Sequence, residues 1–134
     1  MPGEFLDTNI VVYAFTTDPR AGAAQALLGR GCVISVQARN EFTYVARRNL
    51  GMTWREVHDA LAAIRTVCRT ILPEDIETHA DALRMAERYG YTIFDALMIA
   101  AALRARCTVL YSEDMHDGMA IDRRLRIVDP FRDP

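Results

Sequence analysis

The chain has 134 residues, of which 51% are hydrophobic and 25% are charged. This length suits one domain, residues 1–134, and the composition excludes a disordered chain. The net charge is −2, so the overall charge does not indicate a nucleic-acid partner. The N-terminus has no secretory pattern and no apolar run could span a bilayer, which predicts a cytoplasmic protein with no membrane partner.

Short apolar segments alternate with amphipathic or apolar helical segments along the chain. Asp7 or Thr8 can cap the first helix, and Thr53 with Glu56 fits a capping box. The expected strands are residues 4–6, 32–35, 68–72, 108–112 and 126–128. The expected helices are residues 8–15, 20–28, 36–49, 53–66, 73–89 and 92–106.

The expected strands are solidly apolar, as is typical of strands covered on both faces. Their alternation with helices predicts an α/β fold: a three-layer sandwich with a short, mostly parallel central sheet flanked by helices. In such sheets the ligand site lies at the carboxyl ends of the strands.

Four acids lie just past apolar strands or on apolar helix faces. Asp7 follows the first strand and Asp114 closely follows the fourth. Glu41 and Asp95 lie early in helices that enter from the same edge of the sheet. We therefore expect all four side chains to converge there.

Asp95 is the only charge between Ile93 and Leu103. A lone buried carboxylate is costly, and carboxylates brought together repel by roughly 4 kcal/mol per pair at ~4 Å for an effective dielectric near 20. A hard divalent cation removes both problems, because Mg²⁺ and Mn²⁺ prefer oxygen ligands. The pattern predicts an acidic metal site suited to phosphodiester chemistry.

Each acid also has a purely structural interpretation. Asp7 could only cap a helix, Glu41 could pair with a nearby arginine, and Asp95 could form a capping box with Thr92. The segment from Ser112 to Gly118 could be a solvated loop.

Within that segment we expect Asp114 to be the ligand, with Ser112 as a supporting hydroxyl. Asp117 is a further candidate ligand, and Glu113 is expected to point to solvent. Asn9 could support Asp7 by hydrogen bonding or belong only to the turn.

Charge and spacing limit other kinds of site. Without the four acids, 18 − 4 = 14 acids remain against 16 bases, all of them arginine. Arginine suits phosphate contacts, although genomic base composition also explains its use. The cysteines Cys32, Cys68 and Cys107 are scattered and odd in number, so we expect reduced, buried thiols, and the three dispersed histidines do not indicate a zinc site.

Three other functions fit parts of the pattern. A phosphohydrolase with Asp7 as nucleophile would usually have a second acid two residues on, where this chain has Asn9. A receiver-like signalling domain would need a lysine, which the chain lacks. A binding module that docks RNA or a partner without cleaving stays open, although the presence of all four acids argues against it.

Four segments in order resemble the PIN domain, and most closely the VapC toxins of bacterial and archaeal toxin–antitoxin pairs. They are Phe5-Leu6-Asp7-Thr8-Asn9, Glu41 after Val33-Ile34-Ser35, Phe94-Asp95-Ala96-Leu97 with Ile99-Ala100, and Tyr111-Ser112-Glu113-Asp114. The resemblance covers nearly the whole chain.

The resemblance implies a Mg²⁺- or Mn²⁺-dependent ribonuclease that cleaves RNA by metal-activated water and leaves a 5′-phosphate and a 3′-hydroxyl. It implies that Asp7, Glu41, Asp95 and Asp114 are the catalytic acids and metal ligands, with Asp117 as a further ligand. It also implies a homodimer and a cognate antitoxin whose tail blocks the site. The family often has threonine where this chain has Ser112, which keeps the hydroxyl.

Overall fold

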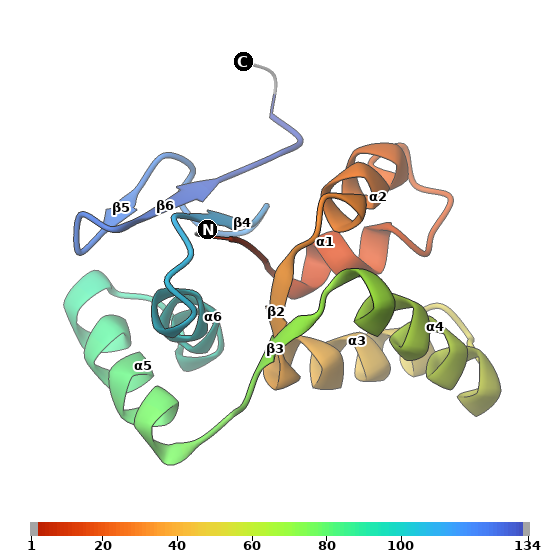
Figure 1. Cartoon of the computed structure of the whole chain (residues 1–134), viewed down its shortest axis with the longest axis horizontal. Helices are drawn as coiled ribbons and strands as arrows, with labels where there is room; N and C mark the ends of the chain where they lie inside the picture. The colour runs from red at the N-terminus through yellow and green to blue at the C-terminus, as the bar shows by residue number, and fades with distance from the viewer. Residues whose placement is uncertain (1–2, 133–134) are drawn as a thin grey trace.

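The computed structural model describes residues 3–132. A six-stranded sheet forms its centre (Figure 1). Its strands are β1 (Glu4–Leu6), β2 (Val33–Ser35), β3 (Thr70–Leu72), β4 (Val109–Tyr111), β5 (Ala120–Ile121) and β6 (Leu125–Val128). The helices are α1 (Thr8–Tyr13), α2 (Ala21–Gly29), α3 (Val36–Arg48), α4 (Trp54–Val67), α5 (Ile76–Tyr89) and α6 (Ile93–Arg104).

The strand order is β3-β2-β1-β4-β6-β5, and only the β5–β6 pair is antiparallel. Figure 1 shows α5 and α6 together on one side of the sheet and α1 to α4 grouped on the other. The prediction of an α/β fold with a mostly parallel, helix-flanked sheet is therefore confirmed. The chain runs outward from β1 through β2 to β3 and then returns to place β4 on the other side of β1. The β1–β4 boundary is thus the topological switch point, where open α/β sheets form their ligand crevice.

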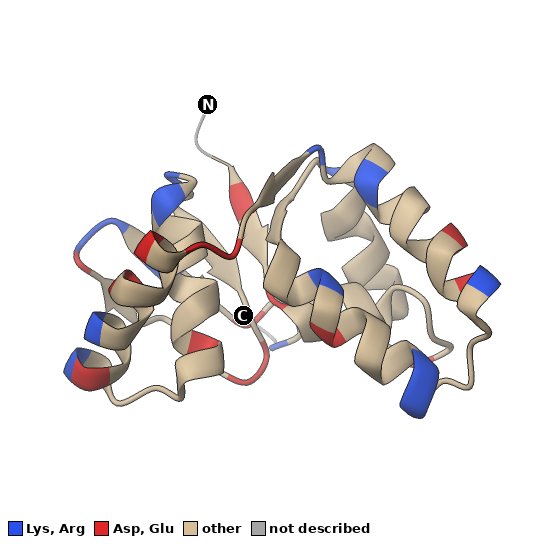
Figure 2. Ribbon diagram, turned by 90° about the horizontal axis from the view of Figure 1, so that it is seen from below, with Lys and Arg blue, Asp and Glu red and all other residues tan. Residues whose placement is uncertain are grey.

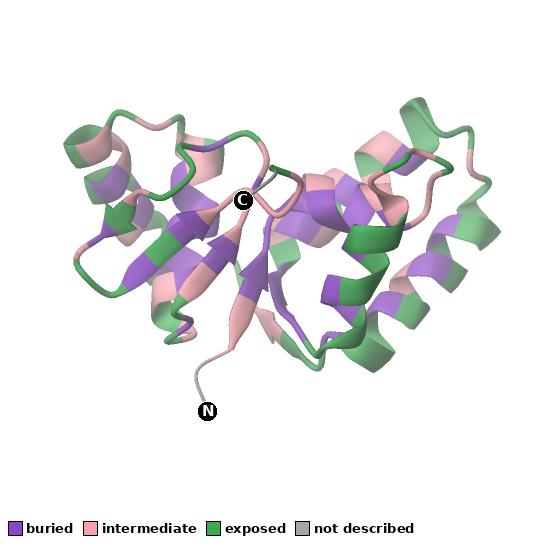
Figure 3. Ribbon diagram, turned by 90° about the horizontal axis from the view of Figure 1, so that it is seen from above, coloured by how far each residue is buried: buried purple, intermediate pink, exposed green. Residues whose placement is uncertain are grey.

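Helix α6 carries Asp95 in its first turn and is buried along most of its length, which fixes where Asp95 lies. All seven residues from Ala96 to Ala102 are buried, so this helix presents no polar face to water. The strands contribute fully buried side chains such as Phe5, Ile34 and Leu110. Figure 3 shows the buried segments concentrated in the strands and on the inward faces of the helices.

Helix caps account for most of the helix boundaries. Thr53 and Glu56 form the expected capping box at the start of α4. The prediction that a helix begins at Pro73 was wrong, because α5 begins at Ile76, where the Asp75 side chain accepts a hydrogen bond from the Thr78 backbone N–H at 2.8 Å. The two-residue strand β5 was not predicted.

The expectation of three reduced cysteines was also wrong. A disulfide joins Cys32, just before β2, to Cys68, which ends α4, with Cα atoms 4.8 Å apart. Cys107 is free and buried, and burial raises the pKa of its thiol to about 11. Scattered spacing along the chain did not indicate that the first two cysteines meet where neighbouring strands begin.

Within the described residues, no helix combines the length and apolar character needed to cross a membrane.

Candidate active site

The site is built where β1 and β4 end side by side. Leu6 pairs with Tyr111 in the parallel ladder, and the Asp7 backbone N–H donates to the Tyr111 carbonyl at 3.0 Å. The next residue of each strand, Asp7 and Ser112, must therefore lie together. The Ser112 hydroxyl donates to Asp7 Oδ2 at 2.8 Å.

Asp7 is a nearly inaccessible carboxylate, with 6% of its surface exposed. Its Oδ1 accepts the Thr8 backbone N–H at 2.7 Å, so it caps α1 as the structural interpretation expected. Burial nevertheless raises the pKa of Asp7 to about 6, against the two hydrogen bonds that lower it. The charges of Asp95 and Glu41 raise this pKa further. Capping and a place in the acidic site are therefore compatible.

Glu41 is held by two neighbouring polar side chains. The Thr8 hydroxyl donates to Glu41 Oε1 at 2.8 Å, and Gln37, one turn earlier in α3, donates to Oε2 at 2.5 Å. These bonds fix the carboxylate beside the end of β1. In residues 3–132 Glu41 forms no salt bridge, so the alternative of an arginine partner is not what the structure shows.

Asp95 lies in the first turn of α6, where its backbone N–H donates to the Thr92 hydroxyl at 3.2 Å. Burial raises the pKa of Asp95, and the charges of Asp114 and Glu41 raise it further. Asp114 lies in the loop after β4, more exposed than the other three acids, and accepts a hydrogen bond from the Asn9 side chain. The predicted supporting role of Asn9 is thus directed to Asp114 rather than to Asp7.

The charges of Asp95 and Glu41 raise the pKa of Asp7, and those of Asp114 and Glu41 raise the pKa of Asp95. The four acids therefore lie close enough to interact electrostatically. Among residues 3–132, however, no group of three Asp, Glu, His or Cys side chains lies close enough together to hold a metal ion by itself. Mg²⁺ commonly retains several waters and binds proteins through one or two carboxylates, so it does not need such an enclosure. The all-oxygen donor set and the unneutralised repulsion at Asp7 and Asp95 fit a hard divalent cation.

Two predictions for the loop after β4 have different outcomes. Glu113 does not point freely to solvent: it accepts from the Tyr13 hydroxyl and from Arg20, both at 2.7 Å. Asp117 accepts a hydrogen bond from the Asp129 backbone N–H at 2.8 Å, and its Oδ2 lies 3.3 Å from Arg132 Nη1. These contacts hold the pKa of Asp117 below its usual value. Its role as a metal ligand stays a prediction.

Two further residues of the site were missed. Thr8 and Gln37 position Glu41, but Thr8 was expected only to cap the first helix and Gln37 only to lie within the helix of residues 36–49. The spacing of Gln37 could have revealed its role, because it lies four residues before Glu41, a separation at which side chains meet on a helix. Nothing local linked Thr8 to a residue 33 positions away.

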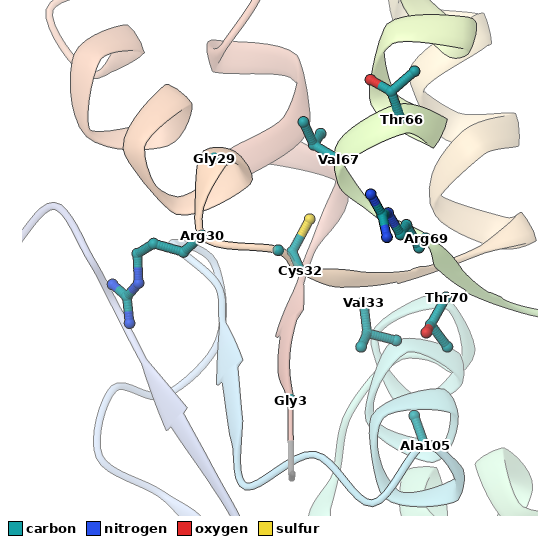
Figure 4. A pocket seen from close by; sticks show the side chains of 11 residues that line it. Gly3, Gly29, Arg30, Cys32, Val33, Thr66, Val67, Arg69, Thr70 and Ala105 are labelled. Atoms are coloured by element: carbon teal, nitrogen blue, oxygen red, sulfur yellow. The ribbon is translucent and has the colours of Figure 1, made fainter.

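A different hollow lies at the opposite end of the sheet and does not contain these acids. It has a volume of about 620 Å³ and is lined by segments that precede the strands, including Gly3, Arg30 and Arg69 (Figure 4). No acidic side chain lines it. Figure 2 shows acidic and basic positions interspersed over the ribbon, so charge alone does not mark one face of the molecule.

A model of the PIN domain family matches residues 5–119, which include Asp7, Glu41, Asp95 and Asp114. The chain belongs to the PIN domain family. No curated protein matched its sequence significantly.

Solved structures with the same fold include several toxin–antitoxin proteins. The PIN domain described here superposes on a chain of a toxin–antitoxin complex from Klebsiella pneumoniae with a TM-score of 0.73 and 19% identity, covering 96% of this chain and 98% of that one. VapC20 of Mycobacterium tuberculosis, a sarcin-ricin loop cleaving toxin, gives 0.63 and 23%, with 80% and 86% covered. VapBC2 from Rickettsia felis, bound to a promoter DNA fragment, gives 0.67 and 17%, with 92% and 96% covered. At these identities the likeness establishes the fold.

Proposed function

We propose that this PIN domain protein is a metal-dependent endoribonuclease and the toxin of a VapBC-type toxin–antitoxin pair. Asp7, Glu41, Asp95 and Asp114 are its catalytic acids and the ligands of Mg²⁺ or Mn²⁺. The observation that carries the proposal is the buried Asp7 carboxylate, whose pKa is raised to about 6 beside further acids at the sheet's switch point. Strongly perturbed acids grouped in such a crevice are typical of catalytic sites.

The residues of the site have separable tasks. Ser112 and the Thr8 backbone N–H orient Asp7 and favour its ionised form, and the Thr8 hydroxyl and Gln37 orient Glu41. When bound, the cation lowers the pKa of water and neutralises charge on the scissile phosphate. The ionised carboxylates of the site would hold the cation, and one of them accepts a proton from the attacking water. The leaving 3′-oxygen takes a proton from solvent, which gives a 5′-phosphate and a 3′-hydroxyl.

The toxin assignment is supported by the descriptions of the structures that share this fold. One belongs to a toxin–antitoxin complex, and VapC20 is a sarcin-ricin loop cleaving toxin. For this chain we propose a cellular RNA substrate, a cognate antitoxin, a homodimer and a cytoplasmic location, with residues 1–134 forming one nuclease domain. The Cys32–Cys68 disulfide is at odds with that location, because the cytosol keeps most thiols reduced.

The direct test incubates purified protein with end-labelled RNA in Mg²⁺, Mn²⁺ or EDTA. We expect cleavage in either metal, none in EDTA, and ends that a 5′-phosphate-dependent exonuclease accepts. Asp59→Asn, an exposed acid on α4 outside the site, is the matched control and should cleave like the parent. Retention of RNA without cleavage in any metal would instead identify the alternative, a catalytically degenerate PIN-like module that binds RNA or a partner.

Metal binding is measured independently by thermal unfolding. Binding to the native state alone adds about 2.7 kcal/mol at a hundredfold excess over Kd. We expect millimolar Mn²⁺ or Mg²⁺ to raise the Tm of the parent and of Asp59→Asn equally. A Tm unmoved by either metal argues against a native-state metal site.

A further inference from the structure

The outer surface of α3 continues from the acidic site toward the start of α4. Glu41, Tyr44 and Arg48 recur at helical spacing i, i+3 and i+7, so they lie along one side of α3. At 1.5 Å per residue, Tyr44 lies about 5 Å and Arg48 about 10 Å along the helix axis from Glu41. A polymer held at Glu41 that followed this side of α3 would meet these side chains.

Two aromatic rings are exposed on this surface. Tyr44 is 53% exposed and Trp54, the first residue of α4, is 57% exposed. Together with Asn40, Thr43 and the two arginines that end α3, they line a shallow hollow of about 450 Å³. We call this hollow and its lining residues the α3–α4 surface.

The arginines of this surface lie close to its rings. The guanidinium carbon of Arg47 is 4.5 Å from the Trp54 ring centroid, and that of Arg48 is 5.8 Å from the Tyr44 centroid. Arg47 also donates to the Met52 carbonyl at 2.9 Å, which orients it across the turn between the helices. The third arginine of α3, Arg39, instead donates to the Leu61 carbonyl of α4 at 3.2 Å.

The positive charge of the α3–α4 surface is not neutralised by neighbouring acids. Arg47 and Arg48 form no salt bridge with any residue between 3 and 132, whereas Arg20, Arg30 and Arg104 each pair with a carboxylate. The acids at Asp7 and Asp95 repel a phosphate chain, so a substrate that enters the site needs cations close by. Arg47 and Arg48 supply them on the same helix as Glu41.

We propose that the α3–α4 surface binds the single-stranded RNA segment that flanks the scissile phosphate. Bases stack on Tyr44 and Trp54, and phosphates contact Arg47 and Arg48. Exposed rings suit any base, and neighbouring arginines track the backbone, which is the combination that single-strand binders use. The inference rests on the proposed ribonuclease function and adds the path of the substrate to it.

The test measures binding separately from cleavage. Fluorescently labelled single-stranded RNA is titrated into full-length protein in EDTA, where cleavage is not expected, and into Asp95→Asn protein in Mg²⁺. In both settings Tyr44→Ala and Trp54→Ala should each weaken binding about tenfold, within the range for loss of one stacked base. Trp54→Phe keeps a ring and should stay within about threefold of the parent.

The arginines give a second, independent readout. Each neutralised phosphate contact contributes a slope of about −0.7 to log K against log salt for a single strand. Arg47→Gln and Arg48→Gln should each reduce the slope by about that amount. The matched controls are Arg124→Gln, an exposed arginine between β5 and β6, and Ile76→Ala, a 71% exposed side chain on α5; both should bind like the parent.

Outcomes separate this inference from the function on which it rests. If the parent cleaves RNA and the four variants bind RNA unchanged, the surface assignment is wrong and the nuclease stands. If the variants lose RNA binding but the parent never cleaves, the surface stands and the nuclease fails. If Trp54→Ala changes sedimentation of the protein or antitoxin binding and leaves RNA affinity intact, the surface belongs to a protein interface and the inference is overturned.

Discussion

The Ser112 hydroxyl donates a 2.8 Å hydrogen bond to Asp7 Oδ2, across 105 residues of sequence. Both groups are buried, and the bond exists because each residue directly follows the last paired residue of its strand. It favours the ionised form of a carboxylate whose burial favours protonation. Ser112 thus helps to set the ionisation of Asp7.

We predict that Ser112→Ala weakens Mn²⁺ binding about tenfold, a typical effect of removing a partner that orients a metal ligand. Without the hydroxyl, the pKa of Asp7 rises further and a proton competes better with the metal. Calorimetric titration of Mn²⁺ at neutral pH measures the effect. Ser112→Thr retains the hydroxyl and serves as the control; equal Mn²⁺ affinity in Ser112→Ala and the parent would contradict the assignment.

Asp95→Asn should abolish RNA cleavage while the fold survives. Loss of about 3 kcal/mol of transition-state stabilisation corresponds to a rate reduction of at least about a hundredfold. Because the charges of Asp114 and Glu41 repel ionised Asp95, the metal-free variant should also melt at a higher temperature than the metal-free parent. Cleavage assays in Mn²⁺ and thermal melts in EDTA test both parts, and cleavage near the parent rate would sink the catalytic assignment.

The raised pKa of Asp7 predicts an unusual pH dependence for the metal-free protein. Between its usual value of 3.8 and about 6, the native state holds a proton that the unfolded state has released. Asp7 therefore contributes stability at low pH that is lost as pH rises toward 6, by about 3 kcal/mol at most.

The comparison with Asp7→Asn isolates that contribution from the other carboxylates. In EDTA, Asp7→Asn should unfold at a higher temperature than the parent above pH 6, and the advantage should disappear by about pH 4. Added Mn²⁺ should reverse the order above pH 6, because only the parent keeps the full ligand set. A difference in Tm that does not change with pH would show that Asp7 does not titrate in this range.

An antitoxin should block the site by presenting a cation to it. An arginine or lysine tail can pair with the unneutralised acids Asp7, Glu41, Asp95 and Asp114 and displace the metal. We expect the tail's contribution to weaken with salt and with Asp95→Asn. The main docking groove should be apolar, walled by residues 8–28 and by α4. Antitoxin affinity at low salt, measured for parent and variant, tests this; equal affinity means that the tail does not engage these acids.

Local patterns predicted those features that depend on neighbouring residues. The strand before Asp7 and the apolar run around Asp95 placed both acids at the same sheet edge, because parallel strands end at one edge and the helices that pack on them begin there. Glu113 shows the limit. Its partners Tyr13 and Arg20 lie 100 and 93 residues away, and no periodicity relates them.

The same limit applies to the boundaries and the cysteines. A proline can open a helix, yet α5 begins three residues after Pro73 because the Asp75 side chain supplies a better cap. Strand β5 has two residues, too few for any alternation to be read from the sequence. The Cys32–Cys68 pair depends on how β2 and β3 align, which only the assembled sheet determines.

The disulfide encloses a particular part of the chain. The 36-residue separation between Cys32 and Cys68 contains α3 and α4, and therefore Glu41 and the whole α3–α4 surface. When the bond is closed, this part of the chain stays a ring even after the rest of the protein unfolds. In the chain-entropy description, a ring of that size restricts the denatured ensemble by about 4 kcal/mol. The helices that carry one site acid and the proposed RNA path are thus the segment whose unfolded state is most confined, while Asp7, Asp95 and Asp114 are supplied by chain outside the ring.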